Sequence, residues 1–382
     1  MKEYKLSQLL EIKNGKDHKE LPNGDYPVFG SGGVMRYVNE YLYDKASILL
    51  PRKGSLNNIQ YCDVPFWTVD TLYYTEVNEK IACPYYLYNY LCLLDLSGLD
   101  TGTGVPSMTF DSYYNIKVLL PEIEEQKRVA SVLQNLDHKI ALNRQINDNL
   151  EAMAKQLYDY WFVQFDFPNE EGKPYKSSGG AMVWNEKLKR EIPQGWSGVS
   201  LKDLAVTSRN AITPIENEVY QHFSIPSFDA CGSYSLDNGS DIKSDKFVLQ
   251  EGQLLVSKLN PWFNRVVWVP RGTNMIGSTE FVVLNPNNKS ESGYIYSVIK
   301  SPKFVAYCSQ AATGTSHSQR RVSPDVLMAF KVAYEPDVVQ KYGCFMENIQ
   351  KRQAELLSET ATLTKQRNEF LPLLMNGQIS IQ

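Results

Sequence analysis

The sequence predicts an α+β fold in which two small domains are carried on two long antiparallel helices with approximate internal two-fold symmetry. Three observations support this prediction: the chain repeats the order of its motifs once, each half ends in a long helix-like segment, and the composition is that of ordinary globular domains. The 382 residues are 43% hydrophobic and 21% charged, which excludes collagen-like, disordered and disulfide-scaffold proteins. This length favours two to three domains, each large enough to bury a core.

The internal repeat begins with a short Leu-x-x-Leu element, Leu6–Leu9 in the first half and Leu201–Leu204 in the second. Three further elements follow in the same order in both halves: an apolar run ending in basic residues (Ile48–Lys53 and Gln253–Lys258), a polar-acidic step (Thr68–Asp70 and Ser278–Glu280) and a Gly turn (Thr101–Thr103 and Thr313–Thr315). Six later pairs, from Asp111 with Asp325 to Lys127 with Lys341, share one offset of 214 residues. We interpret this pattern as a tandem duplication.

A long helix is predicted at the end of each half, because core positions recur there at alternating four- and three-residue steps. In the first helix these positions are Val129, Leu133, Leu136, Ile140, Asn143, Asn147, Leu150, Ala154 and Leu157. In the second they are Phe345, Ile349, Arg352, Leu356, Glu359, Leu363, Gln366, Phe370 and Leu373. Two heptad helices of matching length favour an antiparallel pair with the halves at its opposite ends; the alternative is that each helix caps its own domain.

Five segments follow from this organisation. Domains are predicted over residues 1–121 and 199–335, long helices over residues 122–165 and 336–382, and a connecting segment over residues 166–198. The connecting segment is rich in Gly, Pro and Ser, which is typical of a flexible linker. Its many large apolar residues, including Trp184 and Trp196, favour packing against the helices instead.

The cysteines and the apolar runs bear on the environment of the protein. The six cysteines form no Cys-x-x-Cys pair, so we expect reduced thiols and neither a zinc site nor a disulfide framework. The first residues, Met1–Lys5, contain no apolar signal segment, and no run approaches 18 apolar residues. We therefore expect a soluble cytoplasmic protein that has no membrane partner.

The central region resembles that of Type I restriction-modification specificity (S) subunits. The resemblance rests on Trp161–Pro168, Gly172–Gly180, Met182–Trp184 and Glu191–Trp196, and it continues in Pro121–Arg128 and the helix that begins there. Tyr26–Gly33 and Leu50–Gly54 look like the start of the target-recognition domains of that family. The resemblance covers nearly the whole chain in the same order. The second half departs most, because Glu335–Asp337 replaces the Pro-Glu-Ile-Glu-Glu element of the first.

The resemblance implies a DNA-recognition subunit that is not an enzyme by itself. Residues 1–121 and 199–335 would be target-recognition domains, each reading one part of a bipartite site in double-stranded DNA. The long helices would act as a spacer and as docking surfaces for two methyltransferase (modification) subunits. The assembled enzyme would methylate adenine with S-adenosylmethionine, and separate ATP-dependent restriction and translocase subunits would cleave unmethylated DNA. Both cofactors are therefore implied in partner subunits and none in this chain.

The residues themselves offer no catalytic constellation. Asn260–Phe263 is similar to the Asn-Pro-Pro-aromatic loop of adenine methyltransferases, but it lacks the second Pro, and no strand with a Gly-x-Gly turn precedes it. A phosphate loop of the Gly-x-x-x-x-Gly-Lys-[Ser/Thr] kind is absent from the sequence. The four histidines are far apart and follow no metal-ligand spacing, so we expect no metal site.

Candidate DNA-binding residues cluster at equivalent places in the two halves, where cations, amides and aromatic residues occur together. In the first half they are Arg52, Lys53, Ser55, Asn57, Asn58, Thr101 and Thr103. In the second half they are Lys258, Asn260, Trp262, Asn264, Arg265, Thr313, Thr315, Arg320 and Arg321. Taken alone, each cluster is more typical of a solvated surface than of a contact site. The repetition and the resemblance favour DNA contact for the Arg52 and Lys258 clusters, and both interpretations stay open for the Arg320–Arg321 pair.

The net charge of -4 leaves a rival interpretation open, because DNA-binding domains are usually basic. Residues 1–121 carry 11 basic and 14 acidic side chains, and residues 199–335 carry 13 and 12. A scaffold whose domains bind proteins would explain this charge directly, and a self-sufficient methyltransferase is a second rival. We instead expect a weakly charged DNA reader that relies on basic partner subunits for much of the attraction to phosphates.

Overall fold

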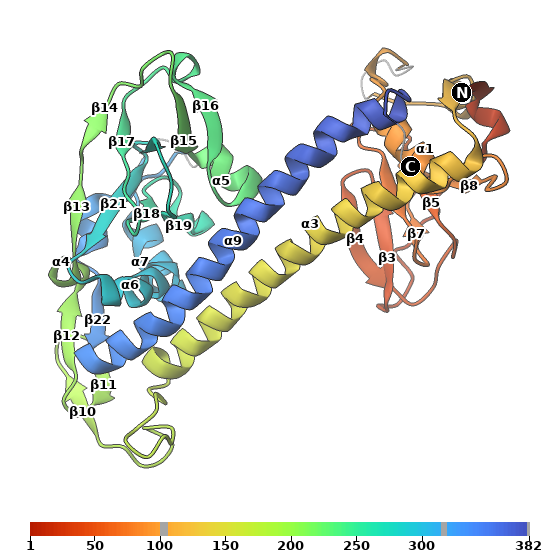
Figure 1. The fold of residues 1–382 in the computed structure, drawn as a ribbon. Coiled ribbons are helices and arrows are strands. Elements are labelled where there is room, and N and C mark those ends of the chain that lie inside the picture. Colours follow the sequence, from red (N-terminus) through yellow and green to blue (C-terminus); the bar gives the residue numbers. More distant parts are fainter. Residues whose placement is uncertain (100–105, 315–318, 380–382) are drawn as a thin grey trace. The chain divides into compact units, whose positions relative to one another are not determined.

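The computed structural model describes residues 1–99, 106–314 and 319–379 and contains both helices and sheets (Figure 1). The chain divides into two compact units: unit 1 comprises Met1–Leu142 with Thr360–Gln382, and unit 2 comprises Asn143–Glu359. The division passes through the two long helices, α3 (Ile123–Tyr158) and α9 (Pro336–Met375). Each unit therefore contains one segment of each long helix.

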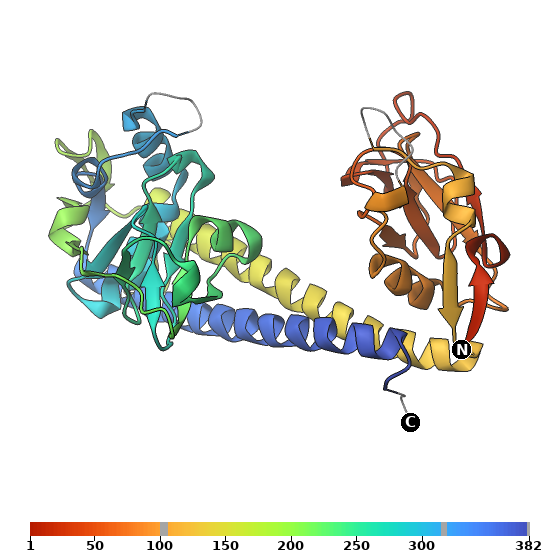
Figure 2. The same cartoon turned by 90° about the horizontal axis from the view of Figure 1, so that it is seen from above.

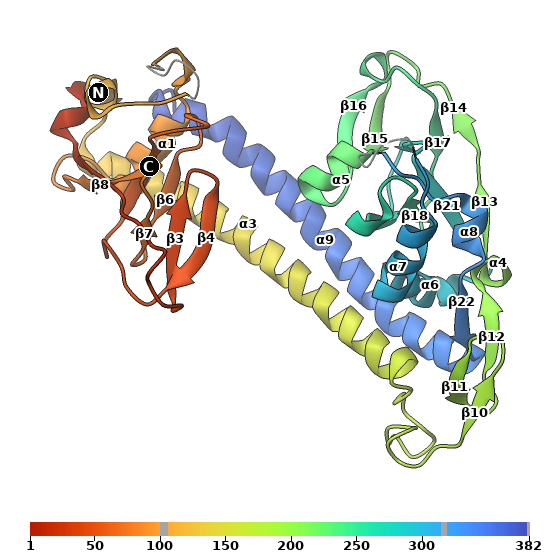
Figure 3. The ribbon, with the colours of Figure 1, turned by 180° about the vertical axis from the view of Figure 1, so that it is seen from behind.

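Unit 1 contains three small sheets. Strand β1 pairs antiparallel with β9, which joins the start of the unit to the strand preceding α3 (Figure 2). The other two sheets have the orders β2-β8-β5-β6 and β4-β3-β7, and β3 and β4 form a hairpin (Figure 3). The strands are β1 (Lys2–Lys5), β2 (Leu10–Lys13), β3 (Tyr26–Gly30), β4 (Gly33–Val38), β5 (Ser47–Pro51), β6 (Gln60–Cys62), β7 (Trp67–Thr68), β8 (Leu72–Val77) and β9 (Lys117–Leu120).

The short helices of unit 1 cover this framework, and all five residues of β5 are buried beneath them and the neighbouring strands. These helices are η1 (Leu6–Gln8), α1 (Pro84–Cys92), η2 (Ser97–Leu99) and α2 (Phe110–Tyr114). Proline at the first position of α1 suits a helix start, because its missing N–H would have no partner there. The apolar run predicted over Ile48–Lys53 therefore forms the central strand of the unit's main core.

The first sheet of unit 2 is the β-hairpin of β10 and β11, and three further sheets follow it. Their strand orders are β12-β22, β13-β21-β18-β19 and β14-β17-β20-β15-β16. The strands are β10 (Met182–Asn185), β11 (Arg190–Pro193), β12 (Ser197–Ser200), β13 (Ala205–Ser208), β14 (Ala211–Ile212), β15 (Val219–Phe223), β16 (Ser235–Asn238), β17 (Lys246–Val248), β18 (Leu254–Ser257), β19 (Val266–Trp268), β20 (Met275–Gly277), β21 (Phe281–Pro286) and β22 (Lys331–Tyr334).

Helix α6 lies against the sheet of β18 and β19, and eight of its nine residues are buried. A helix that is apolar over most of its surface is a core helix, so α6 forms part of the centre of unit 2. The helices of the unit are η3 (Asp159–Val163, a π-helix), α4 (Leu201–Leu204), α5 (Ile225–Cys231), η4 (Gly239–Asp241), η5 (Pro261–Phe263), η6 (Lys289–Glu291), α6 (Ser292–Lys300), α7 (Pro302–Ala311) and α8 (Pro324–Met328).

Two sheets of unit 1 have counterparts of the same strand order in unit 2. The order β2-β8-β5-β6 of unit 1 corresponds to β13-β21-β18-β19 of unit 2. Strand β1 pairs Tyr4 with Val118, and β12 pairs Val199 with Val332, so the later partners keep the offset of 214 residues. The N-caps of α2 and α8, Thr109 and Ser323, are also 214 residues apart.

Within each unit the segments of α3 and α9 run antiparallel. In unit 2, Asn143 donates to Glu359 Oε2 at 2.9 Å, and Tyr342 donates to the carbonyl of Ala154 at 3.3 Å. In unit 1, Arg367 Nε lies 3.0 Å from Asp137 Oδ1. Asn143 is buried, so the polar core position predicted there is occupied by a satisfied amide.

The helical pattern predicted for α9 is correct at Leu356, which is buried, and at Glu359, which contacts Asn143, but it is shifted by one residue at both ends of the helix. Phe345 is 53% exposed, whereas its neighbour Met346 is buried. Gln353 and Arg367 face α3 in place of the predicted Arg352 and Gln366, because their polar groups find partners there. Phe345 and Phe370 are large and apolar, so the sequence favoured the series of core positions that contains them over the series one residue later.

The connecting segment, residues 166–198, is folded. It contains the hairpin of β10 and β11, and its Phe167, Ile192 and Trp196 join the core that also holds Tyr342 of α9. Asp166 accepts hydrogen bonds from the Ser177 amide at 2.7 Å and hydroxyl at 2.6 Å, which fastens the intervening loop. Ile192 and Trp196 therefore pack as predicted, whereas Trp184, which was also expected to pack, is 58% exposed.

The remaining expectations about environment concern thiols and membranes. All six cysteines are free thiols, and two of them, Cys62 and Cys308, are buried. Among the described residues, no helix has the combination of length and apolar character needed to cross a bilayer.

Candidate functional site

The candidate residues of unit 1 lie in the loop that follows β5, which we call the first loop (residues 52–59). The amides of Arg52 and Lys53 both donate to the carbonyl of Thr71, at 3.0 and 3.4 Å. The same segment pairs with residues 106–108: the Met108 amide donates to the Arg52 carbonyl, and the Gly54 amide donates to the Pro106 carbonyl. The structure therefore brings the first loop beside the chain that follows Thr101–Thr103.

The candidate residues of unit 2 lie in the loop that follows β18, which we call the second loop (Lys258–Arg265). The Lys258 amide donates to the Glu280 carbonyl at 2.8 Å. The Asn260 amide donates to the Arg320 carbonyl at 2.8 Å, and the Val322 amide donates to the Lys258 carbonyl at 3.1 Å. Arg321 also pairs with Thr313, so three predicted segments meet here.

These hydrogen bonds align the two loops residue by residue. Lys258 corresponds to Arg52, and Asn260 corresponds to Gly54. Both Asn260 and Gly54 have a positive φ, 48° for Asn260 and 95° for Gly54. The sequence comparison matched Ile48–Lys53 with Gln253–Lys258 and so paired Lys258 with Lys53. That alignment was wrong by one residue. The polar-acidic step is shifted likewise, because Glu280 takes the place of Thr71 and not of Asp70.

The other candidates of unit 1 help to hold the first loop. Asn57 accepts a hydrogen bond from the Leu96 amide at 3.0 Å, and Asn58 donates to the Ser31 carbonyl at 2.5 Å. Lys53 and Ser55 are exposed at the surface of the loop. Thr101, Thr103 and Thr315, which were also predicted to contact DNA, lie outside the described residues.

Arg265 has a different role from the predicted one. Its guanidinium forms a two-pronged ion pair with Asp229 of α5, with Nε to Oδ1 at 2.6 Å and Nη2 to Oδ2 at 2.8 Å. Arg265 is 8% exposed, so it is not available to a phosphate as the sequence suggested. The same hydrogen bonds lower the pKa of the Asp229 carboxyl below its usual value.

The other predicted DNA-binding cations of unit 2 differ in whether their side chains already have a partner in the protein. Arg321 pairs with Glu280 at 3.0 Å, which raises the pKa of Arg321 and offsets its positive charge. Arg320 donates to the carbonyl of Ala312 at 2.6 Å. Lys258 forms no ion pair with any residue that the structure describes, so its charge is free to meet an anion.

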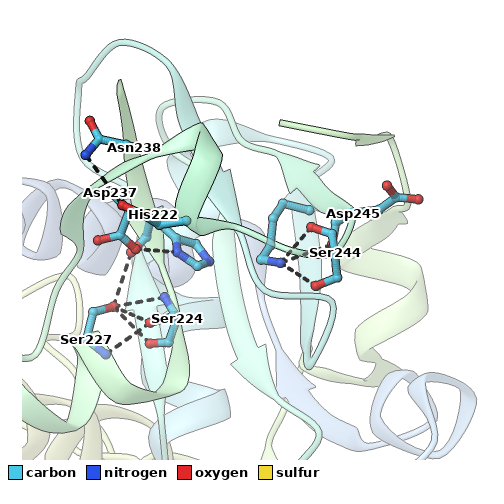
Figure 4. A network of polar contacts seen from close by, with 9 residues as sticks. His222, Ser224, Ser227, Asp237, Asn238, Ser244 and Asp245 are labelled. Atoms are coloured by element: carbon cyan, nitrogen blue, oxygen red, sulfur yellow. Dashed lines mark hydrogen bonds and ion pairs between the residues drawn. The ribbon is translucent and has the colours of Figure 1, made fainter. Parts of the chain in front are cut away.

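A polar network positions α5 and therefore Asp229 (Figure 4). His222 Nδ1 of β15 lies 2.7 Å from Asp237 Oδ2 of β16. Ser224 caps α5 by accepting from the Ser227 amide at 3.1 Å, and the Ser227 hydroxyl lies 3.2 Å from the His222 carbonyl that it donates to. These bonds fix the start of α5 relative to the sheet.

Four residues near the loops were not predicted as part of the site. Ser31 and Gln60 lie beside the first loop, where Gln60 donates to the carbonyl of Gly30 at 2.9 Å. Glu280 and Phe263 belong to the second, Glu280 through Arg321 and Phe263 as an exposed aromatic residue. The Gly30–Gly33 turn was visible in the sequence, but its contact with Asn58 depends on the fold.

The described parts of the chain contain no group of three or more His, Cys, Asp or Glu side chains arranged to hold a metal ion. The Asn260–Phe263 segment forms a surface turn stabilised by its own hydrogen bonds to Arg320.

Comparison with known proteins identifies the class. Residues 1–152 match the family model of the Type I restriction modification DNA specificity domain. The MjaIX specificity subunit of Methanocaldococcus jannaschii is 21% identical, with 95% of this chain and 86% of the relative aligned. The MjaVIII specificity subunit of the same organism is 33% identical over 41% of this chain and 32% of its own length. The S subunit structure from M. genitalium has a TM-score of 0.61 at 15% identity, covering 98% of this chain and 95% of that one.

The fold is therefore that of a Type I restriction-modification S subunit over nearly the full length of both chains. The chain is similar to a Type I specificity subunit over 95% of its length, and its residues 1–152 match the specificity-domain model, which confirms the resemblance found in the sequence. Members of this family are the non-catalytic DNA-recognition components of their complexes.

Proposed function

We propose that this chain reads a bipartite site in double-stranded DNA, with unit 1 and unit 2 each recognising one half-site. The observation that carries the proposal is the matched pair of loops. In both units a cation at the end of a buried strand, Arg52 or Lys258, precedes a positive-φ residue, Gly54 or Asn260. Positive φ lets the backbone turn sharply beside a ligand, and a cation at the turn suits phosphate.

The loops differ in the side chains that would meet base edges. The first loop presents Lys53, Ser55, Asn57 and Asn58, and the second presents Lys258 and Trp262. Amide and hydroxyl groups recognise base edges by hydrogen bonds, whereas an aromatic ring makes apolar contacts. The two half-sites should therefore have unrelated sequences.

The antiparallel segments of α3 and α9 within each unit support a role for these helices as the spacer between two recognition domains, related by a tandem duplication. Asn143 with Glu359 and Asp137 with Arg367 give the pair a polar seam, and polar seam residues fix the register of paired helices. A fixed register would fix the number of base pairs between the half-sites.

Methylation and cleavage belong, in this proposal, to partner chains: two methyltransferase subunits that bind S-adenosylmethionine, and restriction and translocase subunits that use ATP, all in the cytoplasm. The chain's charge supports dependence on partners, because residues 122–167 hold 5 basic and 8 acidic side chains. We expect the isolated chain to bind DNA weakly and basic methyltransferase partners to restore affinity.

The proposal is tested by selecting bound sequences from a random duplex library, using the full chain alone and with the methyltransferase subunits of its locus. Enrichment of one split motif by the complex supports the proposal; enrichment of none, with or without partners, contradicts it. A second assay incubates the chain alone with DNA and labelled S-adenosylmethionine. Methyl transfer without a partner would favour the rival methyltransferase function.

A further inference from the structure

Side-chain hydrogen bonds hold the tip of the second loop at both of its ends. Its three tip residues, Pro261–Phe263, form the 3-10 turn η5 between Asn260 and Asn264, which both adopt the left-handed conformation. Asn260 Oδ1 accepts from the Arg320 amide at 3.0 Å, and Asn264 Nδ2 donates to the Lys300 carbonyl at 3.0 Å. Asn tolerates this backbone conformation better than most residues, so the turn keeps one shape.

This fixed turn holds two aromatic rings out toward solvent. Trp262 is 40% exposed and Phe263 is 57% exposed. Their ring centroids are 6.1 Å apart, with the planes inclined at 46°. The main-chain bond from the Phe263 amide to the Asn260 carbonyl, at 3.1 Å, keeps Phe263 at the outer corner of the turn.

The Phe263 ring packs against the guanidinium of Arg265. The guanidinium carbon of Arg265 lies 4.5 Å from the centre of the Phe263 ring, and Asp229 holds that guanidinium in place with two hydrogen bonds. A cation over a ring face attracts the ring electrostatically, and a paired guanidinium cannot swing away easily. One face of the ring is therefore occupied, and its outer part stays exposed.

We propose that Phe263 enters a base step of the DNA bound by unit 2 by its exposed edge and stacks on one base with the ring face that Arg265 leaves uncovered, with Trp262 beside it. Asp229 and Arg265 are positioning residues that hold the ring. This inference rests on the proposed DNA-reading function and names a specificity-determining residue within it.

A nucleobase fits this tip better than a protein surface does. Two protruding rings cover far less than the roughly 800 Å² per partner of a stable protein interface. Stacking on a base needs only the flat face of a ring, and apolar wedges of this kind enter DNA at flexible base steps. Lys258, at the start of the same loop, supplies positive charge for the adjacent phosphate backbone.

The first loop has no equivalent ring. At the matching place in unit 1, Leu56 is buried in the core, and Asn57 and Asn58 occupy the surface. The inference therefore applies to one half-site only, and the other half-site serves as an internal control.

The experiment uses the full chain with the methyltransferase subunits of its locus and the duplex that the wild-type complex selects. The unit 2 half-site is the one whose selection Lys258→Glu weakens. 2-Aminopurine, whose fluorescence rises when it is unstacked, is placed in turn at positions of both half-sites. The variants are Phe263→Ala, the conservative Phe263→Tyr, and Asp229→Asn, and a circular dichroism melt of each confirms its fold.

The wild type should raise 2-aminopurine fluorescence at one step of the unit 2 half-site, and Phe263→Ala should abolish that signal. Loss of one stacked base should weaken binding about tenfold. The slope of log affinity against log salt should stay unchanged, because no phosphate contact is lost. Phe263→Tyr should retain the signal, and Asp229→Asn should reduce it while leaving the other half-site unaffected.

Wild-type affinity and fluorescence in Phe263→Ala would overturn the inference while leaving the proposed function intact. If the wild-type complex selects no sequence, the proposed function fails, and the inference that depends on it fails too.

Discussion

The amide of Asn260 donates to the carbonyl of Arg320 at 2.8 Å, and the matching bond in unit 1 joins Gly54 to Pro106 at 2.9 Å. In each unit this bond ties a positive-φ residue to a segment far along the chain. The turn that follows the cation therefore depends on tertiary structure. Predictions about DNA contact follow from this relationship, and predictions about stability follow from the helices and the connecting segment.

Charge reversal should weaken DNA binding in a unit-specific way. Arg52→Glu with Lys53→Glu should weaken recognition of one half-site, and Lys258→Glu should weaken the other. Each lost phosphate contact should lower affinity about five- to tenfold at physiological salt, and the salt slope should fall by about one per cation removed. The measurement is a salt titration of binding to the selected duplex.

Exposed lysines outside the loops provide controls of equal charge change: Lys45→Glu with Lys80→Glu in unit 1, and Lys289→Glu in unit 2. Wild-type binding by the Arg52, Lys53 and Lys258 variants would remove the two loops from the interface. Equal weakening of DNA binding by the control variants would show that the effect comes from net charge and not from the two loops.

Gly54→Ala should destabilise the chain by about 1 kcal/mol, because the added methyl makes φ of 95° unfavourable. The space around Gly54 is open, with only Ser31 Oγ at 3.7 Å from the added carbon, so any loss reports backbone strain. Urea denaturation measures the change in the free energy of unfolding. Gly32→Ala, whose methyl meets nothing within 4 Å, is the control and should change stability by less than half as much.

Arg367→Ala should destabilise the chain by about 2 kcal/mol, because it leaves the Asp137 carboxylate and the buried Asn89 Oδ1 without this partner. Arg352→Ala is the matched control on the same helix, since Arg352 is exposed and, among the residues that the structure describes, forms an ion pair only with Glu355 one turn away. The control should fall within about 0.5 kcal/mol of the wild type. Equal losses in thermal or urea denaturation would contradict a structural role for the Arg367 contacts.

Acid stability should depend on Asp166. Hydrogen bonds from Ser177 lower the pKa of this carboxyl below its usual 3.8. A carboxyl with a depressed folded pKa stabilises the fold above its unfolded pKa, and this contribution is lost as the pH falls through the folded value. Wild-type stability should therefore decline more steeply below about pH 4 than that of Asp166→Asn.

The measurement for Asp166 is the urea midpoint as a function of pH. Asp25→Asn, at an exposed position, makes the same charge change as a control. Parallel pH profiles for wild type and Asp166→Asn would show that the Ser177 bonds do not stabilise the charged carboxylate.

Local patterns predicted part of this structure. The buried strand before Arg52 follows from an apolar run, and the helix starts near Pro121 and Pro336 follow from proline and heptad spacing. The predicted frame of α9 was wrong at Arg352 and Gln366 because their neighbours Gln353 and Arg367 contact α3 instead, and only the partner helix shows which polar residue faces inward. The role of Arg265 depends on Asp229, 36 residues away on α5, which periodicity does not reveal.

The same limit applies to the loops. The sequence placed cations and amides at equivalent points of the two halves, but the alignment of Lys258 with Arg52 required main-chain hydrogen bonds. Phe263 was considered only as part of the loop compared with adenine methyltransferases, because neither its exposure nor its contact with Arg265 is visible in the sequence.

The central claim is that two loops of one chain read two unrelated half-sites for partner methyltransferases. Mapping methylated adenines across the genome with the wild-type gene, without it, and with Lys258→Glu tests this claim most directly. One split motif should disappear without the gene, and Lys258→Glu should relax only one half of that motif. An unchanged methylation map after deletion, or equal relaxation of both halves by Lys258→Glu, would contradict the account.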